Sequence, residues 1–144
     1  MKIIEWPDPI LTKVCEPVTV FDNGTIEFAQ QLMDTLILTK NAVGLSAPQV
    51  GESIRIIVMK VNRPYIMFNP EIVKESEIEI GKEGCLSFPG MFLDIQRSKK
   101  ITVRFQDVFG RSQKLKFADL EARCILHEID HLNGIVFTNR TISL

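Results

Sequence analysis

The sequence predicts an α+β fold. Two segments, one early and one late in the chain, place apolar residues at the spacing of an amphipathic helix. Most of the remaining sequence consists of short runs rich in β-branched and aromatic residues, separated by turn-forming residues, which is the pattern of β-strands. Strands before and between two helices give an α+β fold.

The first helix is predicted from apolar residues that recur at helical spacing over residues 29–37. Thr25 is its expected N-cap, and the helix is expected to end near Asn41. Upstream, several prolines and Asn23-Gly24 mark a turn-rich start. The segment Val43 to Gly51 contains two glycines and a proline, so we expect a loop or a bent strand there.

The second helix is predicted from about Leu120 to Leu132, with Asp119 as its N-cap and Asn133-Gly134 as its stop. Between the two helices, β-rich runs predict the strands of the fold. These runs are Ile54 to Val58, Tyr65 to Phe68, Glu71 to Val73, Met91 to Ile95, Ile101 to Phe105 and Gln113 to Phe117.

Length and charge limit the classes of protein that fit. A chain of 144 residues suits a single domain, so we expect residues 1–144 to form one domain. Apolar residues make up 45% and charged residues 24%, which is typical of a globular protein. The net charge of -1 predicts no binding to DNA or to a membrane surface. No apolar run approaches the roughly 20 residues that span a bilayer.

The first residues and the cysteines indicate a compartment. The N-terminus lacks the apolar core and the cleavage site of a secretory signal, and Glu5 counts against a transit peptide. Three cysteines cannot all pair within one chain, which favours reduced thiols. We therefore expect a cytoplasmic protein.

The segment His127-Glu128-Ile129-Asp130-His131 carries the strongest chemical signal. Residues four apart lie on one face of a helix, about 5–6 Å apart, so both imidazoles can bind one metal ion. Glu128 would lie beside the ion without being a ligand, where a base for a bound water belongs. These are the only two histidines of the chain, and they fall on a segment predicted to be helical on other grounds. An alternative is a solvated helix face with two ordinary histidines.

A hydrolytic metal site needs a third protein ligand, and here it must come from upstream. No Asp, Glu, His or Cys follows His131. Cys124 is seven residues from His131, a helical rise of about 10.5 Å, so it cannot join both histidines on one ion. Cys15 is expected to be a small buried apolar residue. Cys85, in a segment with glycines at 81, 84 and 90, is the best third ligand.

Two other functions remain to be distinguished at this point. A metallopeptidase would use the same helix, but its third ligand would be a downstream carboxylate or histidine. A non-catalytic protein with a structural zinc would close its site with four protein ligands.

The chain resembles the peptide deformylases along almost its entire length. Three family motifs appear in the family's order, namely Gly44 to Gln49 (GLSAPQ), Glu83 to Ser87 (EGCLS) and His127 to His131 (HEIDH). Ser87 to Gly90, with Arg123 four residues before His127, looks like the branch found in many bacteria and in organelles. The resemblance implies antiparallel or mixed β-sheets surrounding a central metal-binding helix, with a further helix near the N-terminus.

The resemblance also implies the function and its residues. It implies a metal-dependent hydrolase that removes the formyl group from the N-terminal formylmethionine of nascent polypeptides. Glu128 matches the acid/base, Gln49 the oxyanion-binding amide, and Leu86 the backbone donor. Gly44 matches a strand position that pairs with the substrate. Candidate walls of an apolar pocket for the methionine side chain are Val43, Leu86, Cys124 and Leu120, for which ordinary core packing is the alternative, and Arg123 is expected at the pocket rim. Cys85, His127 and His131 match the metal ligands. Glu83 and Arg97 match an ion pair that supports the cysteine loop, and the alternative is that they are two surface charges.

The implied cofactor is one divalent metal ion, Fe²⁺ natively, with Zn²⁺, Ni²⁺ or Co²⁺ able to occupy the site.

Two motif positions differ from the usual family pattern: Ala42 stands where glycine is common and Leu126 where glutamine is common. The sequence ends at Leu144, whereas many relatives continue into a further helix. We therefore expect a monomer with weak or no ribosome docking, and a final segment in which Ile135 to Phe137 form a short strand before a polar tail, Thr138 to Ser143.

Overall fold

The computed structural model describes residues 1–141 and confirms the α+β fold class. Strands β1 (Gly44–Ser46), β2 (Ile56–Lys60), β3 (Pro64–Cys85), β4 (Phe88–Gln106) and β5 (Ser112–Ala118) form one antiparallel sheet in that order. Two α-helices accompany the sheet, α1 (Asn23–Leu38) and α2 (Asp119–Leu132). Three short 3₁₀ helices complete the fold, η1 (Pro9–Thr12), η2 (Ala47–Val50) and η3 (Phe137–Arg140).

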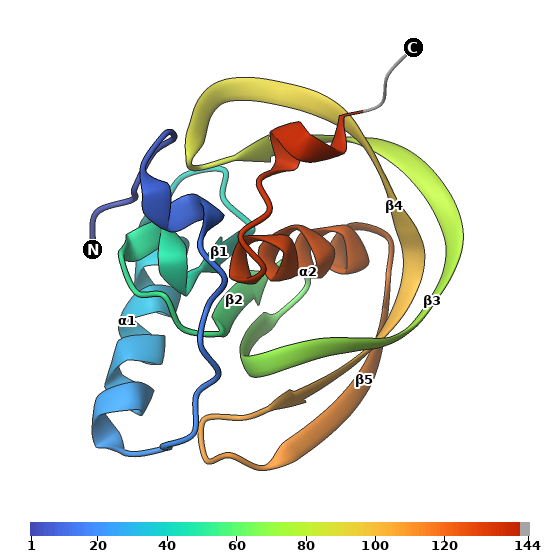
Figure 1. The fold of residues 1–144 in the computed structure, drawn as a ribbon. Coiled ribbons are helices and arrows are strands. Elements are labelled where there is room, and N and C mark those ends of the chain that lie inside the picture. Colours follow the sequence, from blue (N-terminus) through green and yellow to red (C-terminus); the bar gives the residue numbers. More distant parts are fainter. Residues whose placement is uncertain (142–144) are drawn as a thin grey trace.

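The long strands β3 and β4 curve around α2, which lies inside the bend (Figure 1). Register shifts in the β3–β4 pairing, between Phe68 and Glu71 and between Ile72 and Lys74, accompany this curvature. One apolar cluster, which includes Ile125, Ile129 and Val103, packs α2 against the sheet. The strands therefore hold the buried face of α2 against the tip of the β3–β4 hairpin.

Two further apolar clusters pack helix α1 and the C-terminal segment against the sheet. Helix α1 packs on β1 and β2 through residues such as Leu32, Leu36 and Val58. The segment before and within η3 packs near the hairpin tip, with Phe137 beside Phe88. Among the described residues, no helix has both the length and the apolar character needed to cross a membrane.

The structure revises the ends of both predicted helices. Helix α1 ends at Leu38, before the expected Asn41, and its N-cap is Asp22. Thr25 is instead the third helical residue, whose hydroxyl accepts from the Asp22 backbone while Asp22 accepts from the Thr25 N–H. Asp119 is not the N-cap of α2 but its first residue, at a φ of +57°, and it makes no capping hydrogen bond.

Four of the predicted strand runs are parts of two longer strands, because the residues between them are polar or proline: Asn69 and Pro70 in β3, and residues 96–100 in β4. Tyr65 to Phe68 and Glu71 to Val73 both lie in β3, and Met91 to Ile95 and Ile101 to Phe105 both lie in β4. The expected short strand over residues 135–137 is wrong. Val136 and Phe137 are buried, but the chain turns into η3 there.

The predicted polar tail is likewise different, because Thr138 to Arg140 belong to η3 and Arg140 binds Asp130. Its last two residues, at 142–143, lie outside the described part of the chain.

Gly134 ends α2 as predicted and offers a test of the fold. Its φ is +72°, and a Cβ there would lie 2.5 Å from the Thr12 carbonyl oxygen. Gly90 has a φ of +75° with nothing within 4 Å, so it is a matched control. Gly90→Ala should lower the free energy of unfolding by about 1–2 kcal/mol from backbone strain alone. Gly134→Ala should lower the free energy of unfolding, measured by denaturant titration, clearly more than Gly90→Ala does, since Thr12 must also move. Equal costs would show that this contact does not constrain the chain.

Candidate metal centre and active-site pocket

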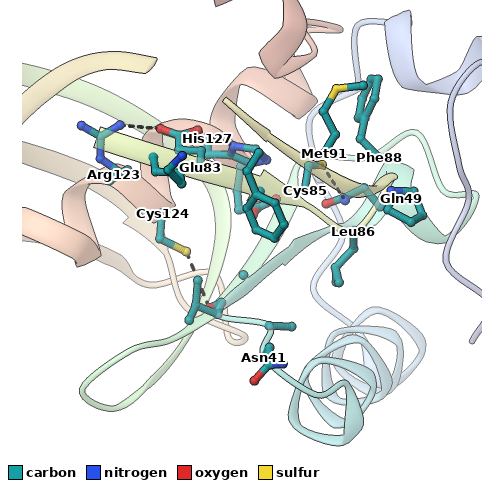
Figure 2. Close-up of a pocket in the computed structure, with 18 of the residues that line it drawn as sticks. Asn41, Gln49, Glu83, Cys85, Leu86, Phe88, Met91, Arg123, Cys124 and His127 are labelled. Carbon is teal, nitrogen blue, oxygen red and sulfur yellow. Dashed lines mark hydrogen bonds and ion pairs between the residues drawn. The ribbon is translucent and has the colours of Figure 1, made fainter. Parts of the chain in front are cut away.

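A cavity of about 500 Å³ opens between β1, the tip of the β3–β4 hairpin and α2 (Figure 2). The sequence motifs that lie far apart in the chain meet around it. Of the residues expected to form the site, Val43, Gly44, Gln49, Cys85, Leu86, Leu120, Arg123, Cys124, His127 and Glu128 line the cavity.

Cys85, His127 and His131 form a compact group of ligand atoms. Cys85 is the last residue of β3, and the two histidines are one turn apart on α2. Their ligand atoms all lie within 4.8 Å of one another, and Cys85 Sγ is 3.3 Å from His131 Nε2. Ligands of one tetrahedral ion are separated by roughly 3–4 Å, so the three side chains can share one ion.

The chemistry of this group fits a divalent metal ion. A thiolate and two imidazoles are a common ligand set for zinc and for first-row transition metals. Burial lowers the pKa of His131 well below its usual range and favours the neutral ring. Burial also acts to lower the pKa of His127, but its hydrogen bonds with Cys85 and Glu83 outweigh burial and raise that pKa to about 10, so a metal ion would have to displace a proton there. Beside the group, Glu128 Oε1 is buried and has no hydrogen-bond partner among residues 1–141. A bound water held next to the ion would satisfy this oxygen.

Glu83 fixes the orientation of His127. Its Oε1 lies 2.8 Å from His127 Nδ1, so a ring that donates from Nδ1 leaves Nε2 as the free ligand atom. Burial alone would raise the pKa of Glu83, but hydrogen bonds from His127 and Arg97 outweigh it and hold the pKa at about 2. Glu83 is therefore a permanent buried anion beneath the site.

Two buried arginines complete the surroundings of Glu83. Arg97 donates to both of its oxygens, at 2.7 and 3.0 Å. Arg123 Nη1 donates to Oε2 at 2.7 Å and to the Ile95 carbonyl at 3.0 Å, and its Nη2 donates to the Glu79 carbonyl. Glu83 and Arg97 are thus a buried ion pair and not two surface charges. Figure 2 shows Arg123 directed at Glu83, so its guanidinium joins α2 to the hairpin.

Glu128 lies on the cavity wall opposite a glycine. Burial raises the pKa of Glu128 to about 7, although the neighbouring His127 acts in the other direction. A Cβ on Gly44 would lie 2.7 Å from Glu128 Oε2 and 2.5 Å from Cys124 Sγ. Only glycine at this position lets β1 approach α2 so closely.

Gln49 is held in one orientation by its neighbours. Its Oε1 accepts from the backbone N–H and the hydroxyl of Ser46, at 3.0 and 2.8 Å. The amide nitrogen therefore points the other way, toward Ser87 Oγ at 3.2 Å and Cys85 Sγ at 3.7 Å. Leu86 lies with Ser87 in the two-residue turn between Cys85 and Phe88. Gln49 Nε2 thus faces the ligand group.

The other cysteines lie outside the ligand group. Cys124 Sγ is 3.6 Å from the Val43 carbonyl oxygen. Burial, and then the charges of Glu128 and Glu83, raise the pKa of Cys124 well above its usual range, which keeps it a thiol. Cys15 is buried in the apolar cluster beneath α2. The structure therefore brings together the three side chains that the sequence indicated as candidate ligands, and neither of the other two cysteines.

Several residues with a role at the site were not singled out from the sequence. Ser46 and Ser87 orient Gln49, and Asp130 binds Arg97 at 2.7 Å. The only signals were their places within the three motifs. Phe88, Met91 and Phe92 line the cavity from the hairpin, which spacing along the chain does not reveal.

Comparison with other proteins identifies the family. The family model described as polypeptide deformylase matches residues 1–144. A peptide deformylase of Pseudothermotoga lettingae is 44% identical over 131 residues, which cover 90% of this chain and 76% of that protein. A peptide deformylase of Desulfotalea psychrophila is 37% identical over 151 residues, which cover 100% of this chain and 89% of that protein.

The fold matches as well. The crystal structure of peptide deformylase from Thermotoga maritima superimposes with a TM-score of 0.95 at 40% identity, covering 99% of this chain and 97% of that chain. Sequence and structure agree with the motif resemblance, and the chain belongs to the polypeptide deformylase family.

Proposed function

We propose that this protein is a metal-dependent hydrolase that removes the formyl group from the N-terminal formylmethionine of nascent polypeptides. The observation that carries the proposal is the grouping of Cys85, His127 and His131 within 4.8 Å, beside the buried carboxyl of Glu128 in an open cavity. Family membership supports the same reaction.

The ligand group also separates this function from the two alternatives. The third ligand is a cysteine from an upstream hairpin and not a downstream carboxylate or histidine, which disfavours a metallopeptidase. Within residues 1–141 the group contains three residues and not the four of a structural zinc site.

Cys85, His127 and His131 would hold one divalent ion, for which we propose Fe²⁺ natively, with Zn²⁺, Ni²⁺ or Co²⁺ as substitutes. When bound, the ion supplies a Lewis acid that polarises the formyl carbonyl and lowers the pKa of a water molecule. The thiolate of Cys85 makes an iron-loaded site sensitive to oxidation. Glu83 would keep His127 in the ligating tautomer throughout.

Glu128 carries the proton in the proposed reaction. Its carboxylate accepts a proton from the attacking water and then delivers it to the leaving amine. A pKa of about 7, raised by burial, suits both transfers near neutral pH. A bound cation would act in the opposite direction and lower this pKa.

Two donors would stabilise the developing oxyanion. Gln49 Nε2 already faces the ligand group, because Ser46 holds the other end of the amide. The backbone N–H of Leu86, one residue after the ligand Cys85, would be the second donor. Donors fixed in place before reaction act where charge develops, and in many hydrolases this electrostatic stabilisation contributes most of the rate enhancement.

The substrate would lie extended against Gly44 and the hairpin tip as an added strand. Its methionine side chain would enter the apolar part of the cavity, where Val43, Leu86, Leu120 and Cys124 are wall residues. Arg123 lines this cavity, but its guanidinium binds Glu83 and two carbonyls. We therefore propose that Arg123 supports the pocket wall.

Glu128→Gln tests the proton-transfer role. The variant keeps the size of the side chain and removes the base, so the protein should retain its ion while turnover of formyl-Met-Ala-Ser falls by a factor of about 100 to 10,000. Metal content and kcat are measured on the same anaerobic preparation. The control is Glu121→Gln, which changes an acid outside the cavity lining on the same helix. Near-full activity of Glu128→Gln with full metal content would refute the role.

We also propose that the protein binds ribosomes weakly and meets its substrate by diffusion. A net charge of -1 provides little overall attraction to ribosomal RNA. Co-sedimentation at physiological salt should leave most of the protein in the supernatant, whereas a pellet fraction that persists at that salt would contradict weak docking.

A further inference from the structure

The hydrogen bonds around the ligand group continue beyond Glu83 to the C-terminal segment. Arg97 uses Nε and Nη2 for Glu83 and places Nη1 2.7 Å from Asp130 Oδ2. Asp130 precedes the ligand His131 and is only 7% exposed. Arg97 therefore lies between two buried carboxylates, and its position depends on both.

Asp130 is in turn held by Arg140. Arg140 Nε donates to Asp130 Oδ2 at 3.0 Å and Nη2 donates to Oδ1 at 2.9 Å, a two-point contact. Arg140 is the only partner of Oδ1 among the side-chain contacts of residues 1–141. The series Arg140, Asp130, Arg97, Glu83 and His127 thus connects the end of η3 to a metal ligand.

The segment that carries Arg140 is itself anchored beside the site. Phe137 is 1% exposed. The centroid of its ring lies 5.7 Å from the ring centroid of His127 and 5.2 Å from that of Phe88. Thr141 makes a β-bridge with Ile95 of β4. Figure 1 shows this segment running from the end of α2 toward β4. Arg140 is consequently fixed on both sides, although its own side chain is 46% exposed.

We propose that Arg140 is a positioning residue that slows loss of the metal ion, acting through Asp130, Arg97 and Glu83 on His127. The proposal rests on the proposed metal centre. Without Arg140, Asp130 would have Arg97 as its only cation and an oxygen without a side-chain partner. Arg97 could then turn a second N–H toward Asp130 and give up one of its two bonds to Glu83. Glu83 would no longer hold the His127 ring in one orientation.

The experiment measures how fast Co²⁺-loaded protein loses its ion to excess EDTA, together with the Co²⁺ absorption spectrum. Removing outer partners of metal ligands typically costs 10- to 100-fold in metal affinity, and Arg140 acts indirectly, so Arg140→Gln should release the ion about 10-fold faster. Its Co²⁺ spectrum should also change. Arg140→Lys keeps the positive charge but cannot make the two-point contact, so its rate of metal release should lie between those of the parent protein and Arg140→Gln.

Two controls separate this role from general destabilisation. Arg111→Gln removes another exposed arginine of an ion pair, that with Asp107, and should leave the release rate unchanged. In a protein that already carries Asp130→Asn, the further change Arg140→Gln should increase the release rate only slightly, because Arg140 acts through Asp130. All rates are measured well below each variant's unfolding temperature, with far-UV circular dichroism confirming the fold.

The outcomes are distinct. Unchanged release and spectrum in Arg140→Gln, in a parent protein that binds one Co²⁺, would overturn this inference alone. Equal acceleration by Arg111→Gln, or full additivity with Asp130→Asn, would also overturn it. A parent protein that binds no ion at Cys85, His127 and His131 would overturn the inference and the proposed metal centre together.

Discussion

The buried negative charge of Glu83 is the constraint on which the rest of the site depends. An ionised carboxyl in the interior is costly unless it is paired and hydrogen-bonded, and removing one partner of a buried pair typically costs roughly 3–5 kcal/mol. Arg97, Arg123 and His127 all meet at this carboxylate. Because these partners come from β4 and α2 while Glu83 belongs to β3, the fold must bring the three elements together for the charge to be satisfied.

The same requirement explains the shape of the sheet around the helix. The β3–β4 hairpin curves around α2 (Figure 1). Cys85, at the hairpin tip, lies close to both histidines, and Glu83 hydrogen-bonds the ring of His127. On the opposite wall, Gly44 brings β1 within contact distance of Glu128. The residues proposed as metal ligands, as the acid/base and as the substrate-binding strand thus lie in or directly beside regular elements, β1, β3 and α2.

The sequence predicted which side chains meet at the candidate site better than it predicted the residues that support them. Two histidines four apart on a helix and a cysteine among glycines follow from local rules, and the structure brings them together. Arg123 could not be placed in the same way, because its partners lie in strands 28 to 44 residues upstream. The runs within β3 and β4 looked separate because Asn69-Pro70 and the polar residues 96–100 interrupt the apolar patterns of the two strands, although Pro70 and Arg97 are buried. The C-terminal apolar residues were expected in a strand, yet Phe137 packs against His127 from a 3₁₀ turn.

The central claim is that Cys85, His127 and His131 bind one catalytic ion, and that Glu83 sets the orientation of the His127 ring. The most direct measurement is the anomalous scattering of a crystal of metal-loaded protein, which locates the ion without reference to activity. The account predicts one ion within about 2.0–2.5 Å of Cys85 Sγ and of one nitrogen of each histidine. His127 Nδ1 should remain hydrogen-bonded to Glu83. An ion bound by Cys124 or Cys15, or a Glu83 turned away from His127 in the loaded protein, would contradict it.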